Sequence, residues 1–247
     1  MSKRKSRYHG HRFPPQVISH AIWLYHRFSL SFRDVEDLLA ERGIEVSYET
    51  IRRWCLKFGL RYRMAPKRRE GRLGDTWYVD EVFIKIGGQQ HYLWRAVDQD
   101  GDVLDILVQR RRDAPAAERF FRKILTGRQE EPRRLMTDKL RSYAPAARHA
   151  LPTALHDTRQ YANNCADVSH QPTRQRERQM RRFKSRHHAQ RFLALHARVQ
   201  NLFRYGRHRI RAVHHRLFRA RAFAVWSQVT CAQRALDCDG SRPRSTM

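Results

Sequence analysis

The sequence predicts an α/β protein in which an all-α domain precedes a mixed β-sheet covered by helices. Up to residue 59, apolar side chains recur at helical spacing; from Trp77 onward, three alternating apolar runs precede an amphipathic helix and a fourth short run. The 247 residues, 40% of them hydrophobic, suffice for one large core and a small satellite domain. We expect an all-α domain over 1–59, a basic linker over 60–76, the sheet domain over 77–205 and a basic tail over 206–247.

The first two helices of the N-terminal domain are marked by the residues at their ends. Pro14 and Pro15 open the first helix, because proline fits a first helical turn, where backbone N–H groups have no helical partner. Ser31, with Asp34 three residues later, is typical of the capping box that starts a helix. Gly43 then supplies a left-handed residue that can end this second helix.

The third helix has the clearest period of this domain. Ser47 can cap it, and Gly59 is expected to end it. Its buried stripe recurs at i, i+3, i+4 and i+7 and consists of Ile51, Trp54, Cys55 and Phe58. The outward face then carries Tyr48, Glu49, Thr50, Arg52, Arg53 and Lys57.

The second and third helices together indicate a way of binding DNA. Two short helices joined by a glycine-containing turn, with hydroxyl and basic groups near the start of the second, are typical of a helix-turn-helix that enters a major groove. The alternative is an ordinary three-helix bundle with solvated charges. The surrounding positive charge favours DNA, so we expect contacts from Tyr48, Thr50, Arg52, Arg53 and Lys57.

The charge distribution indicates a polyanionic partner. Lys and Arg number 51 against 24 Asp and Glu, and the net charge is +27. From Val168 to the end the only acids are Glu177, Asp237 and Asp239, so a basic frame surrounds an acidic centre. This arrangement suits an enzyme that grips nucleic acid by its phosphates and acts on it with metal ions. No membrane-length apolar run, secretory signal or CxxC pattern is present, so we expect no membrane partner and a cytoplasmic protein.

The sheet domain is expected to open with three antiparallel strands, a crossover helix and a strand parallel to the first. This is the opening topology of the ribonuclease H-like fold. The expected elements are a strand over 77–86, a turn at Gly87-Gly88, strands over 91–97 and 103–108, a helix over 114–125 and a short strand ending at Thr137.

Two aspartates in this domain predict a metal site. Asp80 interrupts the first strand, Asp138 directly follows the fourth, and the topology makes them neighbours. A divalent cation shared between them would offset the cost of burying a carboxylate. A third acid is expected downstream, where the candidates are Asp157, Asp167 and Glu177. Asp167 is preferred, because Asp157 falls in an expected loop and Glu177 lies among arginines with which it can pair.

An ordered series of motifs strengthens this prediction. The series comprises Tyr8-His9-Gly10-His11-Arg12-Phe13-Pro14, Ser31-Phe32-Arg33-Asp34-Val35-Glu36, Trp77-Tyr78-Val79-Asp80-Glu81, Tyr92-Leu93-Trp94-Arg95-Ala96-Val97-Asp98, Thr137-Asp138-Lys139, Asn163-Asn164, Ser169-His170-Gln171-Pro172-Thr173-Arg174 and Arg181-Arg182-Phe183-Lys184-Ser185. Along nearly its whole length the chain resembles the DDE transposases of bacterial insertion sequences, in the group whose type member is insertion sequence twenty-six.

The resemblance implies that Asp80, Asp138 and Asp167 are the catalytic acids and hold two Mg²⁺ ions, for which Mn²⁺ can substitute. At the third position the family has glutamate in an Ala-Glu-Asn context, whereas this chain has Asp167 after Ala166, and only 28 residues separate it from Asp138. Arg174 stands seven positions after this acid, where relatives use a basic residue to hold the transposon end. We also expect Lys139 and Arg178 to contact DNA.

The sequence therefore predicts a DNA transposase with an all-α helix-turn-helix domain followed by a ribonuclease H-like catalytic domain. Its expected partners are double-stranded DNA, as transposon ends and target, and further copies of itself on that DNA; its expected place is the nucleoid of a bacterial cell. One alternative is a catalytically degenerate relative that binds transposon ends and represses transposition. A second is a metal-dependent nuclease on the same fold, which leaves the N-terminal domain unexplained.

Overall fold

The computed structural model describes residues 7–64, 74–126, 131–159, 163, 166, 169–204 and 211–232. The chain divides into two compact units, one formed by Met1–Tyr62 with Leu202–Met247 and the other by Arg63–Asn201. Most of the expected linker, residues 65–73, lies outside the described part of the chain. No helix within the described residues is long and apolar enough to cross a membrane.

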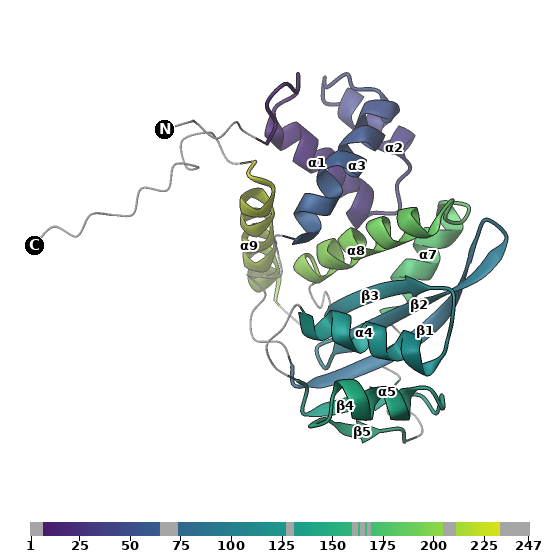
Figure 1. Ribbon diagram of the computed structural model, residues 1–247. Helices are drawn as coiled ribbons and strands as arrows, with labels where there is room; N and C mark the ends of the chain where they lie inside the picture. Colours follow the sequence, from purple (N-terminus) through teal and green to yellow (C-terminus); the bar gives the residue numbers. More distant parts are fainter. Residues whose placement is uncertain are drawn as a thin grey trace, which may run out of the picture. The chain divides into compact units, whose positions relative to one another are not determined.

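The first unit contains α1 (Pro15–Arg27), α2 (Phe32–Ala40) and α3 (Tyr48–Met64) (Figure 1). The predicted helix signals act as expected: a proline occupies the first turn of α1, and Ser31 and Asp34 form a reciprocal capping box at α2. Gly43 has a φ of +71°, the left-handed conformation that ends α2. The stripe of α3 is buried at Ile51, Trp54 and Phe58.

One predicted helix end was wrong. Gly59 does not end α3, which continues to Met64. A glycine inside a helix costs only about 1 kcal/mol relative to alanine, and burial of Phe58 and Tyr62 on either side of it outweighs that cost. The extra turn places the Tyr62 hydroxyl 2.5 Å from that of Tyr8.

Much of the expected basic tail is a helix. Residues Ala212–Thr230 form α9, which contacts α1 and belongs to the same unit. Trp226 is buried; its indole N–H donates to the carbonyl of Ser19, and its ring meets that of Tyr62 edge-on at 5.6 Å. Tyr8 also donates to the carbonyl of Thr230. Residues from the two ends of the chain therefore share one core.

The second unit is built on a five-stranded sheet with the order β3-β2-β1-β4-β5. Strands β1 (Thr76–Ile86), β2 (Gln89–Asp98) and β3 (Val103–Gln109) form the antiparallel part, while β4 (Arg134–Thr137) and β5 (Leu155–Asp157) are parallel to β1. The three antiparallel strands and the parallel β4 confirm the predicted ribonuclease H-like order. Asp157 is in β5, so its prediction as a loop residue was wrong.

One face of the sheet is covered by α4 (Ala114–Thr126) and α5 (Tyr143–Ala150) (Figure 1). Trp94 at the centre of β2 is fully buried there and packs against Phe120 and Tyr143, with ring centroids 6.1 and 5.6 Å away. This cluster is the core of the unit. It holds α5, and with it Tyr143, against the sheet at the end of β4.

The long helix α8 (Arg186–Leu202) follows the outer edge of the sheet, where β3 lacks a neighbouring strand. The side-chain amide of Gln190 accepts from the N–H of Val108 and donates to the carbonyl of Ile106. Asn201 does the same at both backbone groups of Val103. Asn201 follows Gln190 by eleven helical residues, and Val108 follows Val103 by five strand residues; both distances are about 16 Å. The two amides can therefore bond to backbone groups near the two ends of the edge strand at once.

Truncation of Trp226 tests whether α9 is part of the N-terminal core. Trp226→Ala should lower the free energy of unfolding of the first unit by about 3–5 kcal/mol, because it leaves a large cavity and removes the hydrogen bond to Ser19. Calorimetry should show one transition at lower temperature. Leu217→Ala, at a 46% exposed position of the same helix, should change the transition little. Equal effects would contradict this role of α9.

Candidate metal and nucleic-acid site

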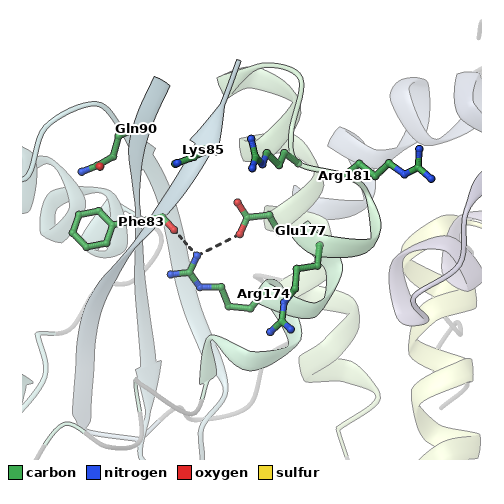
Figure 2. Close-up of a pocket in the computed structure, with 8 residues that line it drawn as sticks. Phe83, Lys85, Gln90, Arg174, Glu177 and Arg181 are labelled. Atoms are coloured by element: carbon green, nitrogen blue, oxygen red, sulfur yellow. Dashed lines mark hydrogen bonds and ion pairs between the residues drawn. The ribbon is translucent and has the colours of Figure 1, made fainter. Parts of the chain in front are cut away.

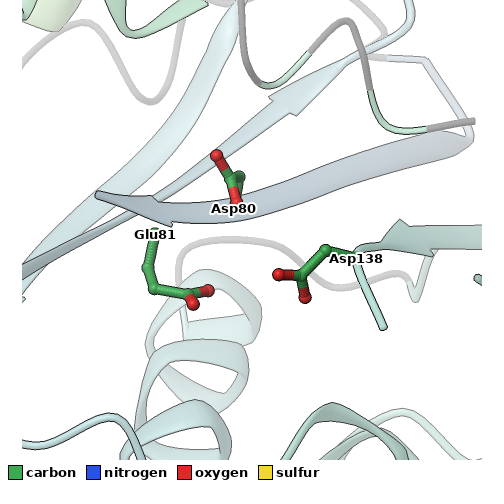
Figure 3. A group of neighbouring side chains, drawn as sticks. All are labelled: Asp80, Glu81 and Asp138. Atoms are coloured by element: carbon green, nitrogen blue, oxygen red, sulfur yellow. The ribbon is translucent and has the colours of Figure 1, made fainter. Parts of the chain in front are cut away.

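The site begins with the parallel pairing of β1 and β4. Val79 lies opposite Thr137 in the register, so Asp80 and Asp138 each follow the paired segment by one residue at the same end of the sheet. Figure 3 shows Asp80 on β1 and Asp138 just past the end of β4, with the Asp138 carboxylate directed toward β1. This adjacency is the one predicted from the strand order.

Glu81 supplies a third carboxylate to this cluster. One oxygen each of Asp80, Glu81 and Asp138 lies within 4.8 Å of the others. Glu81 was not predicted as a member of this site; successive strand residues point to opposite faces, so the strand pattern does not place it beside Asp80. Asp138 lies past the end of β4, and its side chain is partly exposed.

Burial and nearby negative charge perturb the carboxyl groups of Glu81 and Asp138. Burial, opposed by a hydrogen bond from Tyr143 and reinforced by the charge of Asp138, raises the pKa of Glu81 to about 7. Burial and the charge of Asp80 also raise the pKa of Asp138, although 40% of its side chain is exposed. The Glu81 side chain is only 2% exposed. Glu81 and Asp138 therefore resist ionisation in this cluster, and a cation would relieve that cost.

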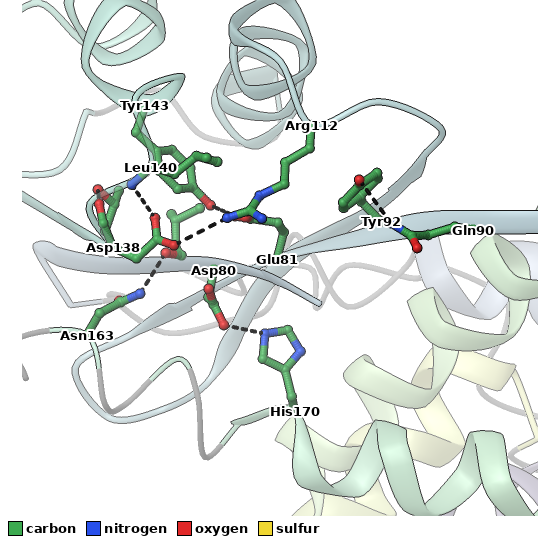
Figure 4. A network of polar contacts seen from close by, with 12 residues as sticks. Asp80, Glu81, Gln90, Tyr92, Arg112, Asp138, Leu140, Tyr143, Asn163 and His170 are labelled. Carbon is green, nitrogen blue, oxygen red and sulfur yellow. Dashed lines mark hydrogen bonds and ion pairs between the residues drawn. The ribbon is translucent and has the colours of Figure 1, made fainter. Parts of the chain in front are cut away.

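Two side chains hold Glu81 from the α4 and α5 side of the sheet (Figure 4). Tyr143 is buried, and desolvation together with Glu81 raises its pKa well above the ordinary value, so its hydroxyl stays protonated and donates to the carboxylate. Arg112, in the loop before α4, has Nε 2.5 Å from Glu81 and Nη2 3.8 Å from Asp138. Its guanidinium thus bridges two of the three acids.

Asp80 is approached from the opposite face by the start of α7 (Gln171–Gln179). Nε2 of His170, a buried residue, lies 3.3 Å from Oδ2 of Asp80. Burial lowers the pKa of His170, so the neutral imidazole is favoured. Thr173 accepts a hydrogen bond from Arg95. Arg95 lies opposite Asp80 in the register of β1 and β2. These contacts fix the first turn of α7 beside the carboxylates.

The predicted third acid, Asp167, lies outside the described residues, as do Asn164 and Cys165. The two rejected candidates have other contacts. Asp157 forms an ion pair with Arg159 at 2.6 Å, and Glu177 lies 3.4 Å from Arg174. Nearer to the site, Asn163 donates from its amide to the carbonyl of Val79, next to Asp80.

The cluster is chemically suited to a divalent cation. All three groups offer carboxylate oxygens, the hard ligands that Mg²⁺ and Mn²⁺ prefer. Their oxygens lie close enough for a shared ion after small side-chain adjustments. The exposed side of Asp138 leaves a route for an ion and a phosphate, whereas Glu81 and Asp80 close the inner side. The residues present therefore fit a divalent metal.

A basic groove of about 670 Å³ runs between β1 and α7 (Figure 2). Arg174 donates to the carbonyl of Phe83 at 2.5 Å, on the part of β1 that lies beyond its pairing with β4. Arg181 and Arg182, at the end of α7, have φ values of 49° and 74°, an uncommon conformation for residues with a side chain. The lining combines five cations with one acid: Phe83, Lys85, Gln90, Arg174, Glu177, Arg178, Arg181 and Arg182.

The residues expected to contact DNA lie in two regions. On α3, Tyr48, Arg52, Arg53 and Lys57 are exposed and Thr50 is half-buried. Arg52 and Arg53 both pair with Glu49, at 2.8 and 3.3 Å, whereas Nζ of Lys57 lies 2.8 Å from the imidazole of His11. In the second unit Arg178 and Arg174 line the basic groove, and the exposed Lys139 follows Asp138.

This chain matches a transposase family model and curated relatives that are transposases. Residues 74–206 match the DDE domain of IS240-type transposases. The transposase for insertion sequence-like element IS431mec of Staphylococcus aureus strain N315 is 30% identical over 168 residues, which cover 64% of this chain and 73% of the relative. The same values hold for the transposase for insertion sequence element IS257 in transposon Tn4003 of Staphylococcus aureus.

Solved structures with partial similarity include two forms of the HTLV-2 integrase catalytic core domain in complex with magnesium. The trimeric form is 13% identical with a TM-score of 0.36 and covers 54% of this chain and 88% of that chain. The dimeric form is 16% identical with a TM-score of 0.30 and covers 38% and 67%. The order and direction of the five strands, independently of these scores, define the fold of the second unit.

The raised pKa of Glu81 predicts a pH-dependent stability. In metal-free protein the folded state keeps a proton on Glu81 up to pH about 7, whereas the unfolded state releases it near the ordinary value of 4.5. The free energy of unfolding should therefore fall by roughly 3 kcal/mol as pH rises from about 4.5 to 7. The free energy of unfolding of Glu81→Gln should not show this decrease. Urea unfolding at a series of pH values, with a chelator present, measures it.

A matched control is Glu49→Gln. The pKa of Glu49 is lowered to about 2 by Arg52, so its contribution to stability changes below pH 4.5 and the fall above that pH should persist. If the free energy of unfolding of Glu81→Gln decreases between pH 4.5 and 7 as much as that of the natural chain, Glu81 does not titrate in this range.

Proposed function

The chain belongs to the family of DDE transposases, which are polynucleotidyl transferases, and we propose that it cleaves and transfers the ends of an insertion sequence of the group typified by insertion sequence twenty-six. One observation carries this proposal. In a segment that matches the DDE domain, Asp80, Glu81 and Asp138 converge at the open end of a parallel strand pair. Carboxylates so placed serve metal-dependent phosphoryl transfer.

The proposed reaction has two displacements at phosphorus. In the first, water attacks the phosphate at the transposon end, the bond to the 3′ oxygen breaks and a 3′ hydroxyl is released. In the second, that hydroxyl attacks a phosphate of target DNA and displaces another 3′ oxygen. Two Mg²⁺ ions, or Mn²⁺ in their place, would activate the attacking oxygen and stabilise the leaving one. No covalent protein intermediate is required.

The side chains of the site have distinct roles in this proposal. Asp80 and Asp138 would hold the metal ions from neighbouring strands. Tyr143 and Arg112 fix the orientation of Glu81, which offers a further oxygen to the cluster. Arg112 also lies near the exposed side of Asp138, where it can contact a phosphate without leaving Glu81.

We assign the third catalytic acid to Asp167. Its neighbours in the chain approach the site from both directions: Asn163 bonds to the carbonyl of Val79, and His170 lies 3.3 Å from Asp80. Only six residues separate Asn163 from His170, and this short interval supports our proposal that Asp167 acts together with Asp80 and Asp138. Arg174 would then hold the phosphate of the transposon end from the following turns of α7.

DNA recognition is proposed for α3 and the basic groove. Tyr48, Thr50, Arg52, Arg53 and Lys57 would reach into a major groove of the terminal repeat, and Lys139, Arg174 and Arg178 would contact phosphates near the cleavage site. Joining two transposon ends to a target requires more than one catalytic site, so we propose that the protein works as a homo-oligomer on DNA. Its place would be the nucleoid of its bacterial host.

A second function is supported by a specific feature of the sequence. Asp167 stands where the family has glutamate, and the interval to Asp138 is short. A side chain shorter by one methylene can move a ligand oxygen by more than the roughly 0.5 Å that metal sites tolerate. A chain that binds transposon ends without cleaving them would repress transposition.

Strand cleavage and joining of a labelled terminal-repeat duplex, in Mg²⁺ and in Mn²⁺, separates these functions. The natural chain should cleave and join, and Asp80→Asn and Asp167→Ala should each lose at least about a hundredfold in rate, because each removes a metal ligand. Asp100→Asn, in an exposed turn of the same unit, should be unaffected.

The outcomes are distinct. An inactive natural chain that Asp167→Glu restores would identify a decayed enzyme one methylene from function. Site-specific binding with no cleavage in any of the variants would favour the repressor, whereas cleavage without joining would favour a nuclease. Full activity of Asp167→Ala would exclude Asp167 as the third acid.

Recognition by α3 is tested through the salt dependence of binding. Lys57→Ala should weaken binding to the terminal repeat and reduce the slope of log affinity against log salt concentration by about 1, because one phosphate contact is lost. Fluorescence anisotropy over a salt series measures both quantities. Arg122→Ala, which removes an exposed cation paired with Glu118 on α4, should leave the slope unchanged. Equal slopes for Lys57→Ala and the natural chain would exclude this contact.

A further inference from the structure

The face of the sheet that carries Glu81 continues past the metal cluster as an uncovered surface. Phe83 follows Glu81 by two residues in an unbroken register, so both side chains point to the same face, about 7 Å apart along the strand. The α4 and α5 core covers Glu81, but Phe83 is 48% exposed. A large aromatic ring therefore faces solvent beside the carboxylates.

Phe83 is one half of an aromatic pair. Tyr92 lies directly opposite it on β2, and the two ring centroids are 5.3 Å apart at an interplanar angle of 53°. Tyr92 is held by a hydrogen bond from the side chain of Gln90 to its hydroxyl. Among the described residues of the second unit, the other large exposed apolar side chain is Leu155, on the edge strand β5. An exposed phenylalanine ring backed by a half-buried tyrosine is thus a local feature of this face.

The charge around the pair fits a polyanion. No acid occurs between Val82 and Val97, which includes the whole β1–β2 turn. The guanidinium carbon of Arg112 lies 6.0 Å from the centroid of the Phe83 ring, while its nitrogens contact Glu81 and Asp138. Lys85, two residues further along the same face, is exposed. The Phe83 ring therefore has Arg112 on the side of the carboxylates and Lys85 further along the strand.

Phosphates at the cations and an aromatic surface between them are the two elements of single-stranded nucleic-acid binding. A base inside a duplex is stacked on both sides and cannot offer its face to Phe83. A base that has left the helix can do so. Because Arg112 reaches both Phe83 and Asp138, the phosphate of such a nucleotide would lie beside the metal cluster.

We propose that Phe83 and Tyr92 stack an unpaired base of the transposon end adjacent to the cleaved phosphate, with Arg112 and Lys85 holding the phosphates on either side. This inference rests on the proposed function, because the DNA strand is the one that the carboxylates act on. Phe83 and Tyr92 position the strand and touch no reacting atom. The cost of unpairing the base is offset by stacking on the ring.

The test is a double-mutant cycle in which the affinity of each protein variant is measured for each DNA variant. Equilibrium affinity is measured for a duplex carrying the terminal repeat and for duplexes with a single abasic site at each successive nucleotide around the cleavage position. The proteins are the natural chain, Phe83→Ala, Phe83→Tyr and, as an exposed apolar control in the same unit, Leu155→Ala. Binding does not depend on whether cleavage follows.

Phe83→Ala should weaken binding to intact DNA by about 5- to 150-fold, the range for loss of one base–aromatic stack. At one abasic position the natural chain should lose a similar factor, and Phe83→Ala should lose nothing further, because no base remains to stack. Phe83→Tyr should keep the natural affinity, and Leu155→Ala should bind every duplex as the natural chain does.

Three results would overturn the inference. Independent effects of Phe83→Ala and of every abasic site would show that the ring stacks on no base. A change in self-association of DNA-free Phe83→Ala in sedimentation velocity, without the coupling, would assign the face to contact with another copy. Absence of specific binding to any duplex would reject the proposed function itself, whereas specific binding without coupling rejects the stacked base alone.

Discussion

Parallel pairing of β1 with β4 is the constraint on which the site depends. The register sets Val79 opposite Thr137, so the next residue of each strand, Asp80 and Asp138, must emerge at the same end of the sheet. Their carboxylates then lie close to that of Glu81, and burial and repulsion raise the pKa of Glu81 and of Asp138. A divalent cation would relieve the cost of gathering acids in this way, and the surrounding contacts hold the acids in place.

Those contacts come from elements that are far apart in the sequence. Tyr143 of α5 and Arg112 before α4 fix Glu81 from one face, whereas His170 before α7 approaches Asp80 from the other. The arginines of α7 extend from the same point along the part of β1 that lies beyond its pairing with β4. The net charge of +27 is not spread evenly: cations surround a small acidic centre, which suits the proposed binding of DNA phosphates.

Each unit also completes its core with a distant segment. In the first, α9 places Trp226 and Thr230 against residues of α1 and α3 and against Tyr8. In the second, the side-chain amides of Gln190 and Asn201 on α8 bond to backbone groups of Val103, Ile106 and Val108 on the edge strand β3. Deleting the C-terminal part of the chain would therefore remove structure from the helical unit as well as charge.

The sequence by itself determined the elements whose signals are local. Proline and Ser31 with Asp34 began α1 and α2, Gly43 ended α2, and alternating residues gave β1 to β3, because capping and side-chain periodicity act over a few residues. The strand order expected from the sequence also predicted that Asp80 and Asp138 would be neighbours. Only the tertiary structure decided that α3 passes Gly59, that Ala212–Thr230 closes the N-terminal core and that Glu81 joins the acids. These depend on burial and on approach from distant segments, which no local pattern records.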